Sequence, residues 1–532
     1  MRGPLSPPAL RFARRGRTVA VGRTVALVVV LALVACSAPA RAPDTADPLA
    51  PARVARMRAY IRDAWPRLTR TPADLPIAAR DDKLPHAPGA PWPVYFPASD
   101  DRAAVEAAVA RAVPPARLGD IMLRPLPAAL SEHGLLYLPR PYVVPGGRFN
   151  EMYGWDSYFI VLGLVRDDRG LAADMVANFL YEVRHYGGVL NANRTYYLTR
   201  SQPPLLSAMV LALYRSGDHA DVTLLREARD AIVATYEHWT APPHLIPAIG
   251  LSRYFDHGDG PAPEVVAGER DAHGDSHYDR VRAYFRAHGD PDELTPQFYK
   301  ADRAMRESGF DPTGRFGPFG ADTLGIAPVC LNTLLYRMEV DLASIEGTLA
   351  GDAAAARWWA LAQARKARIE ALLWDEGAGL YFDYDFERGR RRPYPFATTF
   401  WPLWAGLASP AHARGVRDHL AVFERRGGVV TSTTVTGAQW DAPFGWAPLQ
   451  LFAVDGLRRY GFRDDADRIA RAFVSMLVVD FERRGTLVEK YDVERRTSDV
   501  AGRLAFGYTS NEVGFGWTNG VALELLAGLQ RE

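Results

Sequence analysis

Five segments of the chain combine carboxylates, arginines and aromatic side chains between glycines or prolines: residues 145–159, 191–204, 306–317, 437–448 and 487–520. Taken singly, such residues usually serve as helix caps or surface ion pairs. Taken together, flat aromatic faces, carboxylates and forked arginine donors suit a neutral ligand that is rich in hydroxyl groups. This composition predicts a carbohydrate site.

Cleavage of a glycosidic bond needs two carboxyl groups with different roles. One must be protonated, so that it can donate to the leaving oxygen, and the other must be ionised, so that it can activate water or attack. Composition does not choose this pair among the many acids. The sequence has no GxGxxG after a strand, no GxxxxGK[ST], HExxH or GxSxG motif and no metal-like Cys/His spacing, which argues against nucleotide, zinc and serine-hydrolase chemistry.

Length, charge and cysteine content narrow the class further. At 532 residues with 48% hydrophobic content, the chain can bury a large core. The 63 Lys and Arg residues nearly balance 62 Asp and Glu residues, a net charge of +1 that indicates no nucleic-acid partner. Only Cys36 and Cys330 are present, so we expect no disulfide framework.

The elements that must position the five segments are helical. Apolar residues recur at helical spacing in residues 171–183, 205–214, 225–239, 329–342, 353–373, 448–460 and 464–478. Long loops rich in Gly, Pro and aromatic residues lie between them, with almost no strand alternation. This pattern predicts an all-α fold of stacked helical hairpins with the functional loops on one rim. Because no low-complexity linker interrupts residues 56–532, we expect them to form one domain.

The first 55 residues differ from the rest. Six arginines precede an apolar run at residues 24–35, which is typical of a secretory signal peptide in residues 1–36. The run ends in Leu-Val-Ala-Cys, which favours a lipid anchor on Cys36, and cleavage near Ala40 without lipid is the alternative. A Pro/Ala-rich tether follows in residues 37–55. These features predict an exported, periplasmic protein.

Two stretches carry a family resemblance. Residues 145–158, PGGRFNEMYGWDSY, and residues 439–448, QWDAPFGWAP, resemble the signature stretches of the α,α-trehalases, which split trehalose into two glucoses. The resemblance is to bacterial periplasmic enzymes of glycoside hydrolase family 37 and extends from about residue 60 to the end of the chain. It implies an (α/α)6 barrel with the site in its mouth, an inverting mechanism without metal or cofactor, and a monomer that acts on trehalose.

The resemblance also implies individual roles. The family's general acid is the aspartate of a Glu-Ser-Gly-Trp-Asp stretch, and ESGFD gives this role to Asp311. The general base is the glutamate of Val-Glu-Lys-Tyr-Asp-Val, and VEKYDV gives it to Glu489. Apolar neighbours should favour the neutral form of Asp311, and Lys490 the ionised form of Glu489. The implied substrate-binding residues are Arg148, Trp155, Asp156, Asn191, Arg200, Ser201, Gln202, Glu264, Gly309 and, in the lid, Glu512.

The chain departs from the family pattern in several of these loops. Phe310 stands where a Trp usually precedes the acid, Phe444 where an Asn is common, and the glycine-rich lid before GFGWTNG is altered. Ala262 replaces the arginine of an Arg-Pro-Glu stretch. Loss of this forked donor should cost about 1.5–3 kcal/mol of binding unless another group replaces it. Arg253 and Arg270, in the same long loop, are candidates.

Two other functions remain open at this point. An inverting glycosidase of the same barrel that acts on another α-glucoside fits the change at Ala262. A non-catalytic sugar-binding protein would keep the aromatic residues but would not need both Asp311 and Glu489. Release of glucose from trehalose, but not from maltose or sucrose, distinguishes the three.

Overall fold

The structure is a computed structural model that describes residues 47–530, except residues 85, 267, 269, 271, 272 and 509. The predicted signal segment, Cys36 and most of the predicted tether lie outside the described residues. Helix α1 (Pro51–Leu68) begins at Pro51, because the fixed φ of proline suits the first turn of a helix. Residues 51–55, predicted as tether, are therefore helical.

Among the described residues, six helices form a closed inner ring. Neighbours contact one another in the order α4 (Asp156–Asp167), α6 (Leu206–Arg215), α11 (Val329–Ala350), α13 (Trp401–Ala405), α15 (Ala447–Arg459) and α17 (Gly516–Leu529), and α17 returns to α4. The α17 helix is buried on nearly all sides. A helix that is apolar all round is stable only in an interior, which explains its place in the inner ring.

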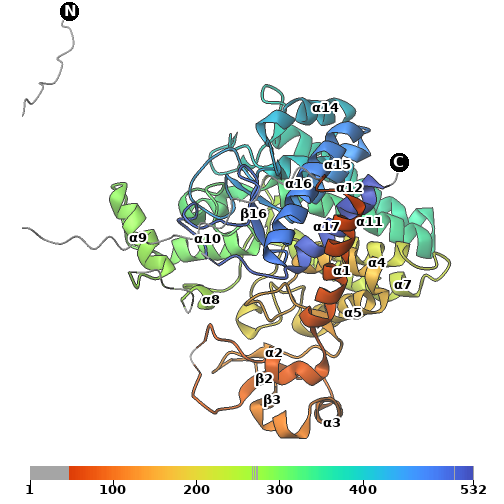
Figure 1. Cartoon of the computed structure of the whole chain (residues 1–532), viewed down its shortest axis with the longest axis vertical. Coiled ribbons are helices and arrows are strands. Elements are labelled where there is room, and N and C mark those ends of the chain that lie inside the picture. Colours follow the sequence, from red (N-terminus) through yellow and green to blue (C-terminus); the bar gives the residue numbers. More distant parts are fainter. Residues whose placement is uncertain are drawn as a thin grey trace, which may run out of the picture. The chain divides into compact units, whose positions relative to one another are not determined.

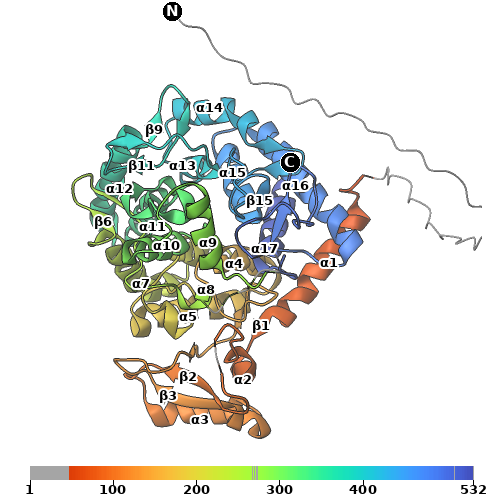
Figure 2. The ribbon, with the colours of Figure 1, turned by 90° about the vertical axis from the view of Figure 1, so that its left-hand side faces the viewer.

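A second set of helices alternates with the first along the chain and covers it from outside (Figures 1 and 2). Besides α1 it consists of α5 (Arg169–Tyr186), α7 (Thr223–Thr240), α12 (Asp352–Leu372), α14 (Pro410–Asp418) and α16 (Arg463–Arg484). In α16, the buried residues Ile469, Phe473 and Leu477 recur every four positions, as an outer helix with one buried face requires. The two layers make an (α/α)6 barrel, which confirms the predicted fold class.

Each of the seven helical stretches predicted from periodicity corresponds to an observed helix. The predicted residues 225–239, for example, are α7 (Thr223–Thr240), and residues 353–373 are α12 (Asp352–Leu372). Helix α11 continues to Ala350, eight residues beyond the predicted end. The inner helices α4, α13 and α17 and the outer helices α1 and α14 were not predicted. Helix α17 is buried on nearly all sides and therefore shows little apolar periodicity.

The inner helices α4 and α17 approach each other at two glycines. A Cβ atom added to Gly520 would lie 1.9 Å from the carbonyl oxygen of Phe159, and one added to Gly163 would lie 2.8 Å from the Cα of Gly520. No side chain fits at these distances, so the absence of side chains lets the two helices touch. This contact closes the inner ring between the first and last of its helices.

A small α/β unit lies between α1 and α4 in the chain and was not predicted. Strands β2 (Trp92–Phe96), β3 (Ile121–Pro125) and β4 (Leu135–Leu136) form a parallel sheet in the order β3-β2-β4, with α3 (Arg102–Ala112) between β2 and β3 in the chain. Buried residues of the unit, such as Val94, Phe96 and Val109, form a core of their own. Its strands are too short for sequence alternation to reveal them.

Short elements connect the helices and carry loops of the barrel mouth. Strand β15 (Phe444–Trp446) pairs antiparallel with β16 (Lys490–Asp492), which joins two of the five segments singled out in the sequence. The other helices are α2 (Leu75–Ala78), α8 (Pro263–Val266), α9 (His277–Ala287) and α10 (Pro296–Glu307). The other strands are β1 (Thr69–Arg70), β5 (Tyr142–Val143), β6 (Leu245–Ile246), β7 (Leu251–Ser252), β8 (Ile326–Ala327), β9 (Trp374–Asp375), β10 (Leu380–Tyr381), β11 (Tyr384–Asp385), β12 (Arg390–Arg391), β13 (Glu424–Arg425) and β14 (Gly428–Val429).

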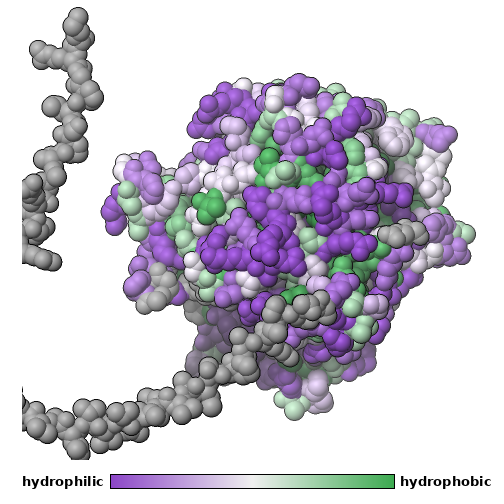
Figure 3. All heavy atoms as spheres, turned by 45° about the horizontal axis from the view of Figure 1, so that its top comes forward, coloured by the Kyte–Doolittle hydropathy of each residue, from purple (hydrophilic) through white to green (hydrophobic). Residues whose placement is uncertain are grey.

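The surface drawn in Figure 3 is mostly hydrophilic, with hydrophobic side chains in small separate spots. Scattered apolar residues are normal on a folded protein and indicate no binding patch on this face. None of the helices in the described part of the chain is both long and apolar enough to cross a membrane.

Candidate active site

A cavity of about 210 Å³ lies among loops that come from all five segments singled out in the sequence. Most of the predicted site residues line it: Asp311, Glu489, Arg148, Trp155, Asp156, Asn191, Arg200, Gln202, Glu264 and Gly309. Segments separated by more than three hundred residues in the chain thus contribute to one cavity. We consider its acids first, then its arginines and aromatic residues.

Asp311 follows the end of α10 in a tight turn. Gly309 adopts a φ of 74°, and a Cβ there would lie 3.0 Å from the indole of Trp155, so only glycine suits this position. The Asp311 side chain is 32% exposed, and Arg306 Nη1 donates to its Oδ2 at 3.2 Å. Burial raises the pKa of the Asp311 carboxyl to about 6, although Arg306 and Arg200 oppose the shift. The pKa of Asp311 is therefore shifted upward, which is the direction that a proton donor requires.

Glu489 lies directly before β16 and is almost fully buried. The Tyr508 hydroxyl donates to Oε1, and Lys490 Nζ donates to Oε2 at 3.4 Å. Burial raises the pKa of Glu489, and Lys490 and Tyr508 only partly oppose this effect. Lys490 contacts the carboxylate and favours its ionised form, as expected, but burial outweighs this charge and the pKa of Glu489 still rises.

A third carboxyl group completes the acidic part of the cavity. Asp156 is the first residue of α4 and is buried. Burial raises its pKa well above the usual range, and the charges of Glu489 and Asp311 raise it further. Asp156 therefore lines the cavity as a third carboxyl group and feels the charges of both Asp311 and Glu489.

Arg200 and Glu264 present unused hydrogen-bonding atoms. Arg200 donates from Nε to Asp256 at 3.0 Å and from Nη1 to Glu264 Oε1 at 2.7 Å. Its Nη2 is buried without a protein partner, and so is Glu264 Oε2. Burial would raise the pKa of Glu264, but the Arg200 guanidinium outweighs it and the pKa falls to about 2. A charged donor and a charged acceptor thus remain available beside the cavity, as a ligand with hydroxyl groups requires.

Two predicted binding residues do not line the cavity. The Ser201 hydroxyl donates to the carbonyl oxygen of Val189 at 2.5 Å, so the backbone already uses it. Glu512 accepts a hydrogen bond from the backbone N–H of Arg148 at 2.9 Å and lies 3.7 Å from its guanidinium. Contact of these two residues with a ligand in the cavity is therefore not supported. Ser201 instead holds the loop that carries its neighbours Arg200 and Gln202, and Glu512 holds the loop of Arg148. These three neighbours line the cavity.

The aromatic residues divide into core and lining. Trp155 lines the cavity, and its ring centroid lies 5.6 Å from that of Phe310 and 5.9 Å from that of Trp440. Phe310 is fully buried and does not line the cavity. The change from Trp at this position therefore affects packing behind Trp155 and removes no stacking face. Phe444, in β15, is likewise fully buried.

Neither predicted candidate replaces the arginine that is missing at Ala262. Arg253 donates to the carbonyl oxygens of Pro243 and Leu324, and Arg270 donates to that of Gly274. Neither lines the cavity. Arg280, on α9, does line it, and its Nε is buried without a partner.

Several lining residues were missed in the sequence. They are Lys83, Phe149, Tyr153, Tyr197, His277, Arg280, Arg306, Gln439, Trp440, Tyr508 and Trp517. Arg306, Gln439 and Trp440 stand in segments that the sequence had singled out, so their composition could have found them. Arg280 and His277 lie on α9, where charged residues look like an ordinary solvated helix face.

Comparisons with family models and with known proteins point to the same family. A model of the trehalase family matches residues 116–530. The chain is 41% identical over 432 residues to a cytosolic neutral trehalase of Neurospora crassa and 38% identical over 420 residues to one of Saccharomyces cerevisiae. Both alignments cover 71% of this chain, and 57% and 55% of those proteins. The chain therefore spans little more than half the length of these relatives.

A solved structure covers more of the chain. The neutral trehalase Nth1 from Saccharomyces cerevisiae superimposes with a TM-score of 0.74 at 33% sequence identity, over 90% of this chain and 94% of the other. The comparisons contradict the predicted periplasmic location, because the relatives named above are cytosolic proteins. They likewise give no support to a signal peptide or to a bacterial periplasmic type.

The match to the family model, the sequence identity and the barrel agree with the motifs that surround Asp311 and Glu489. The chain belongs to the trehalase family.

Proposed function

We propose that the chain is an inverting α,α-trehalase that hydrolyses trehalose to two molecules of glucose. One observation carries the proposal: Asp311 and Glu489 line the same cavity as Arg200, whose buried Nη2 has no protein partner. Two acids of perturbed pKa beside an unused charged donor fit a neutral, hydroxyl-rich substrate. The names of the related proteins, neutral trehalases, support the same substrate.

In the proposed reaction Asp311 is the general acid. Its carboxyl gives a proton to the glycosidic oxygen as the bond between that oxygen and C1 breaks. Its pKa of about 6, raised by burial, keeps a useful fraction protonated near neutral pH. Arg306 donates to the same carboxyl and stabilises the carboxylate that the reaction leaves behind.

Glu489 is the proposed general base. It removes a proton from a water molecule whose oxygen bonds to C1 on the face opposite the leaving group. One water is consumed per trehalose, the attacked glucose leaves as the β anomer, and the other keeps its α configuration. The hydrogen bond from Tyr508 and the contact with Lys490 orient the carboxylate for this step.

The remaining residues of the cavity bind the two glucose rings. We assign this role to Arg148, Trp155, Asp156, Asn191, Arg200, Gln202, Glu264 and Gly309, with Arg280 in place of the arginine missing at Ala262. Because the described residues of one chain supply all these groups, we propose that residues 56–532 act as one catalytic unit and as a monomer.

An assay of three disaccharides tests the proposal. Trehalose should release two glucose molecules, whereas maltose and sucrose should release none. Release of glucose from another α-glucoside in preference to trehalose would favour the second candidate function, an inverting glycosidase with a different substrate. The change at Ala262 is the observation that fits this alternative. Binding of trehalose without release of glucose would contradict the proposal.

A further inference from the structure

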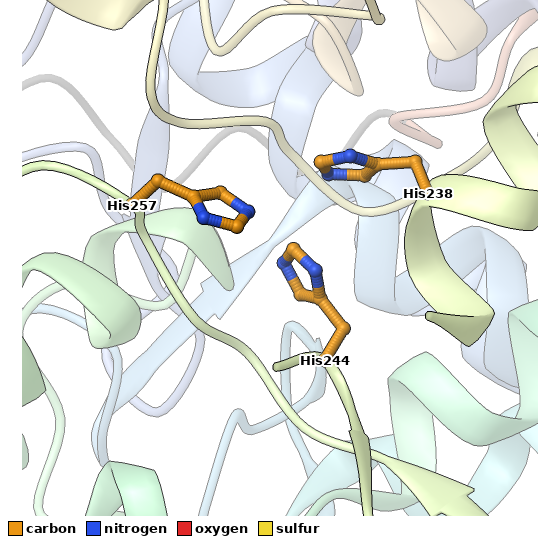
Figure 4. Close-up of side chains that lie close together, drawn as sticks. All are labelled: His238, His244 and His257. Atoms are coloured by element: carbon orange, nitrogen blue, oxygen red, sulfur yellow. The ribbon is translucent and has the colours of Figure 1, made fainter. Parts of the chain in front are cut away.

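Three histidines that the proposed reaction does not use converge outside the cavity. His238 lies near the end of α7, His244 just before β6, and His257 in the loop after β7. Figure 4 shows their imidazole rings facing a common space, and one nitrogen from each lies within 4.8 Å of the others. The fold brings together residues whose spacing in the chain resembles no metal motif.

We propose that His238, His244 and His257 bind one transition-metal ion of the Zn²⁺ class. Three imidazoles suit Zn²⁺, Cu²⁺, Ni²⁺ or Fe²⁺ and not the oxygen-seeking Mg²⁺ or Ca²⁺. Tetrahedral Zn–N bonds of 2.0–2.1 Å place ligand nitrogens about 3.4 Å apart, so the rings must move together by about 1 Å. The exposed side chain of His257 can make this movement.

The hydrogen bonds of the cluster leave lone pairs for a metal. His238 Nε2 is buried without a hydrogen-bond partner, an arrangement that a polar atom rarely adopts unless a ligand completes it. A neutral imidazole is the form that binds metal.

Glu307 supplies the outer support that a metal-binding histidine usually has. Its Oε2 lies 3.3 Å from His244 Nε2, which assigns the proton to Nε2 and leaves the Nδ1 lone pair for the ion. Oε2 also accepts from the backbone N–H of Phe255 at 2.7 Å. Glu307 is therefore held in place independently of the histidines.

The charged groups around the cluster do not occupy it. Lys300 donates to the carbonyl oxygens of residues 256–258 and forms an ion pair with Asp259 at 2.8 Å. Asp256 pairs with Arg200 and Arg303. Because His257 is exposed, solvent can fill the remaining coordination position, and we expect a site that binds a metal without catalysing a reaction.

The site would join three separate segments: the end of α7, the loop before β6 and the loop after β7. Glu307 connects it to the cavity wall, since its Oε1 accepts from the backbone N–H of Ser201 at 3.2 Å. Metal binding should therefore stabilise the folded chain and the loop that carries Arg200, while the turnover rate changes little.

A titration with metal alone tests the site. The full chain is treated with EDTA, dialysed and titrated with Co²⁺, whose visible d–d absorption reports coordination by nitrogen, and Zn²⁺ is then added to displace it. We expect one Co²⁺ per chain, full displacement by Zn²⁺, and a rise of a few degrees in the melting temperature when Zn²⁺ is bound. No Co²⁺ spectrum and no Zn²⁺-dependent stabilisation would overturn the proposal.

Matched variants assign the ligands. His257→Ala changes an exposed side chain and should fold normally, yet it should lower the affinity for Co²⁺ at least tenfold and abolish the stabilisation by Zn²⁺. His238→Ala should do the same. His219→Ala removes another exposed histidine, which lies after α6 with its Nε2 3.1 Å from the carbonyl oxygen of Arg215, and should bind like the parent chain. Equal binding by the parent and His257→Ala would overturn the assignment.

Discussion

In the proposed mechanism, the neighbours of Asp311 and Glu489 decide which of the two carboxyl groups acts as acid and which as base. Both carboxyl groups have raised pKa values because both are removed from water, but Arg306 contacts the first and Lys490 and Tyr508 contact the second. The sequence motifs point to the two proposed catalytic acids. Their protonation depends on neighbouring groups that come into contact with them only in the folded chain.

Replacing Asp311 by Asn should remove the proton donor and preserve the shape of the site. We expect kcat to fall about 10²–10⁴-fold, the usual contribution of a general acid, while trehalose still binds. Initial rates and binding calorimetry measure the two effects. Asp292→Asn, an exposed aspartate paired with Arg286, is the matched control and should be unchanged. Turnover within threefold of the parent in Asp311→Asn would place the acid elsewhere.

The pH profile of kcat/KM should report the carboxyl of Asp311. Its pKa of about 6 means that the protonated acid, and with it the rate, should fall about tenfold per unit at higher pH. Arg306 favours the carboxylate, so its removal should raise the pKa of Asp311. In Arg306→Gln the alkaline limb should therefore move upward by about one pH unit, whatever the loss in rate. A downward movement, or none, would contradict the role given to Asp311.

Arg280 should take the place of the arginine that is missing at Ala262. Because it lines the cavity with an unused Nε, Arg280→Ala should remove a charged hydrogen bond to the sugar and raise KM about tenfold or more. Steady-state kinetics with trehalose measure the change. Arg270→Ala should leave KM unchanged, since Arg270 donates to the backbone away from the cavity. Equal KM values for the two variants would contradict the proposal that Arg280 binds the sugar.

At the scale of helices, apolar periodicity predicts α5, α7, α12 and α16 of the outer layer and α6, α11 and α15 of the inner layer, and it misses the other helices of both layers. Helix α7 has a buried face that carries Ile232, Tyr236 and Trp239, and its limits were predicted to within two residues. Helix α17 has almost no exposed face, so the periodic signal is weak there. Such helices are specified by close contact with one another, which sequence does not display.

The contact between α4 and α17 should be sensitive to a single methyl group. Gly520→Ala would place Cβ 1.9 Å from the carbonyl oxygen of Phe159, a backbone atom that cannot move aside. We expect a loss of about 1–3 kcal/mol in stability, visible as a lower melting temperature. Gly347→Ala, in α11, is the control: its nearest atom would be 3.7 Å away, and removal of a helical glycine should leave stability equal or higher. Equal melting temperatures would contradict the close contact.

At the scale of the whole molecule, the loops that form the candidate site were predictable from the sequence, whereas Arg280 and the α/β unit were not. The loops around Arg148, Arg200, Asp311 and Glu489 carry recognisable motifs, and the barrel brings them to one cavity. Arg280 reaches this cavity from an ordinary polar helix. The α/β unit, with strands of two to five residues, likewise leaves too short a pattern to detect.

The histidine cluster likewise was not predictable from the sequence. His238 lies near the end of α7, His244 lies just before β6 and His257 follows the hairpin of β6 and β7, a spacing that matches no known metal motif. The fold brings their nitrogens within 4.8 Å. Without a known spacing, sequence reasoning does not detect such a group.

The most direct test of inverting trehalose hydrolysis is an NMR spectrum of the products before the anomers equilibrate. Purified chain is mixed with trehalose, and the anomeric protons are followed from the first turnovers. With Asp311 as acid and Glu489 as base, one β-glucose and one α-glucose should appear per trehalose consumed, because only the attacked carbon inverts. Two α-glucoses at early times would contradict inversion and the role of Glu489, and no glucose at all would contradict trehalase activity itself.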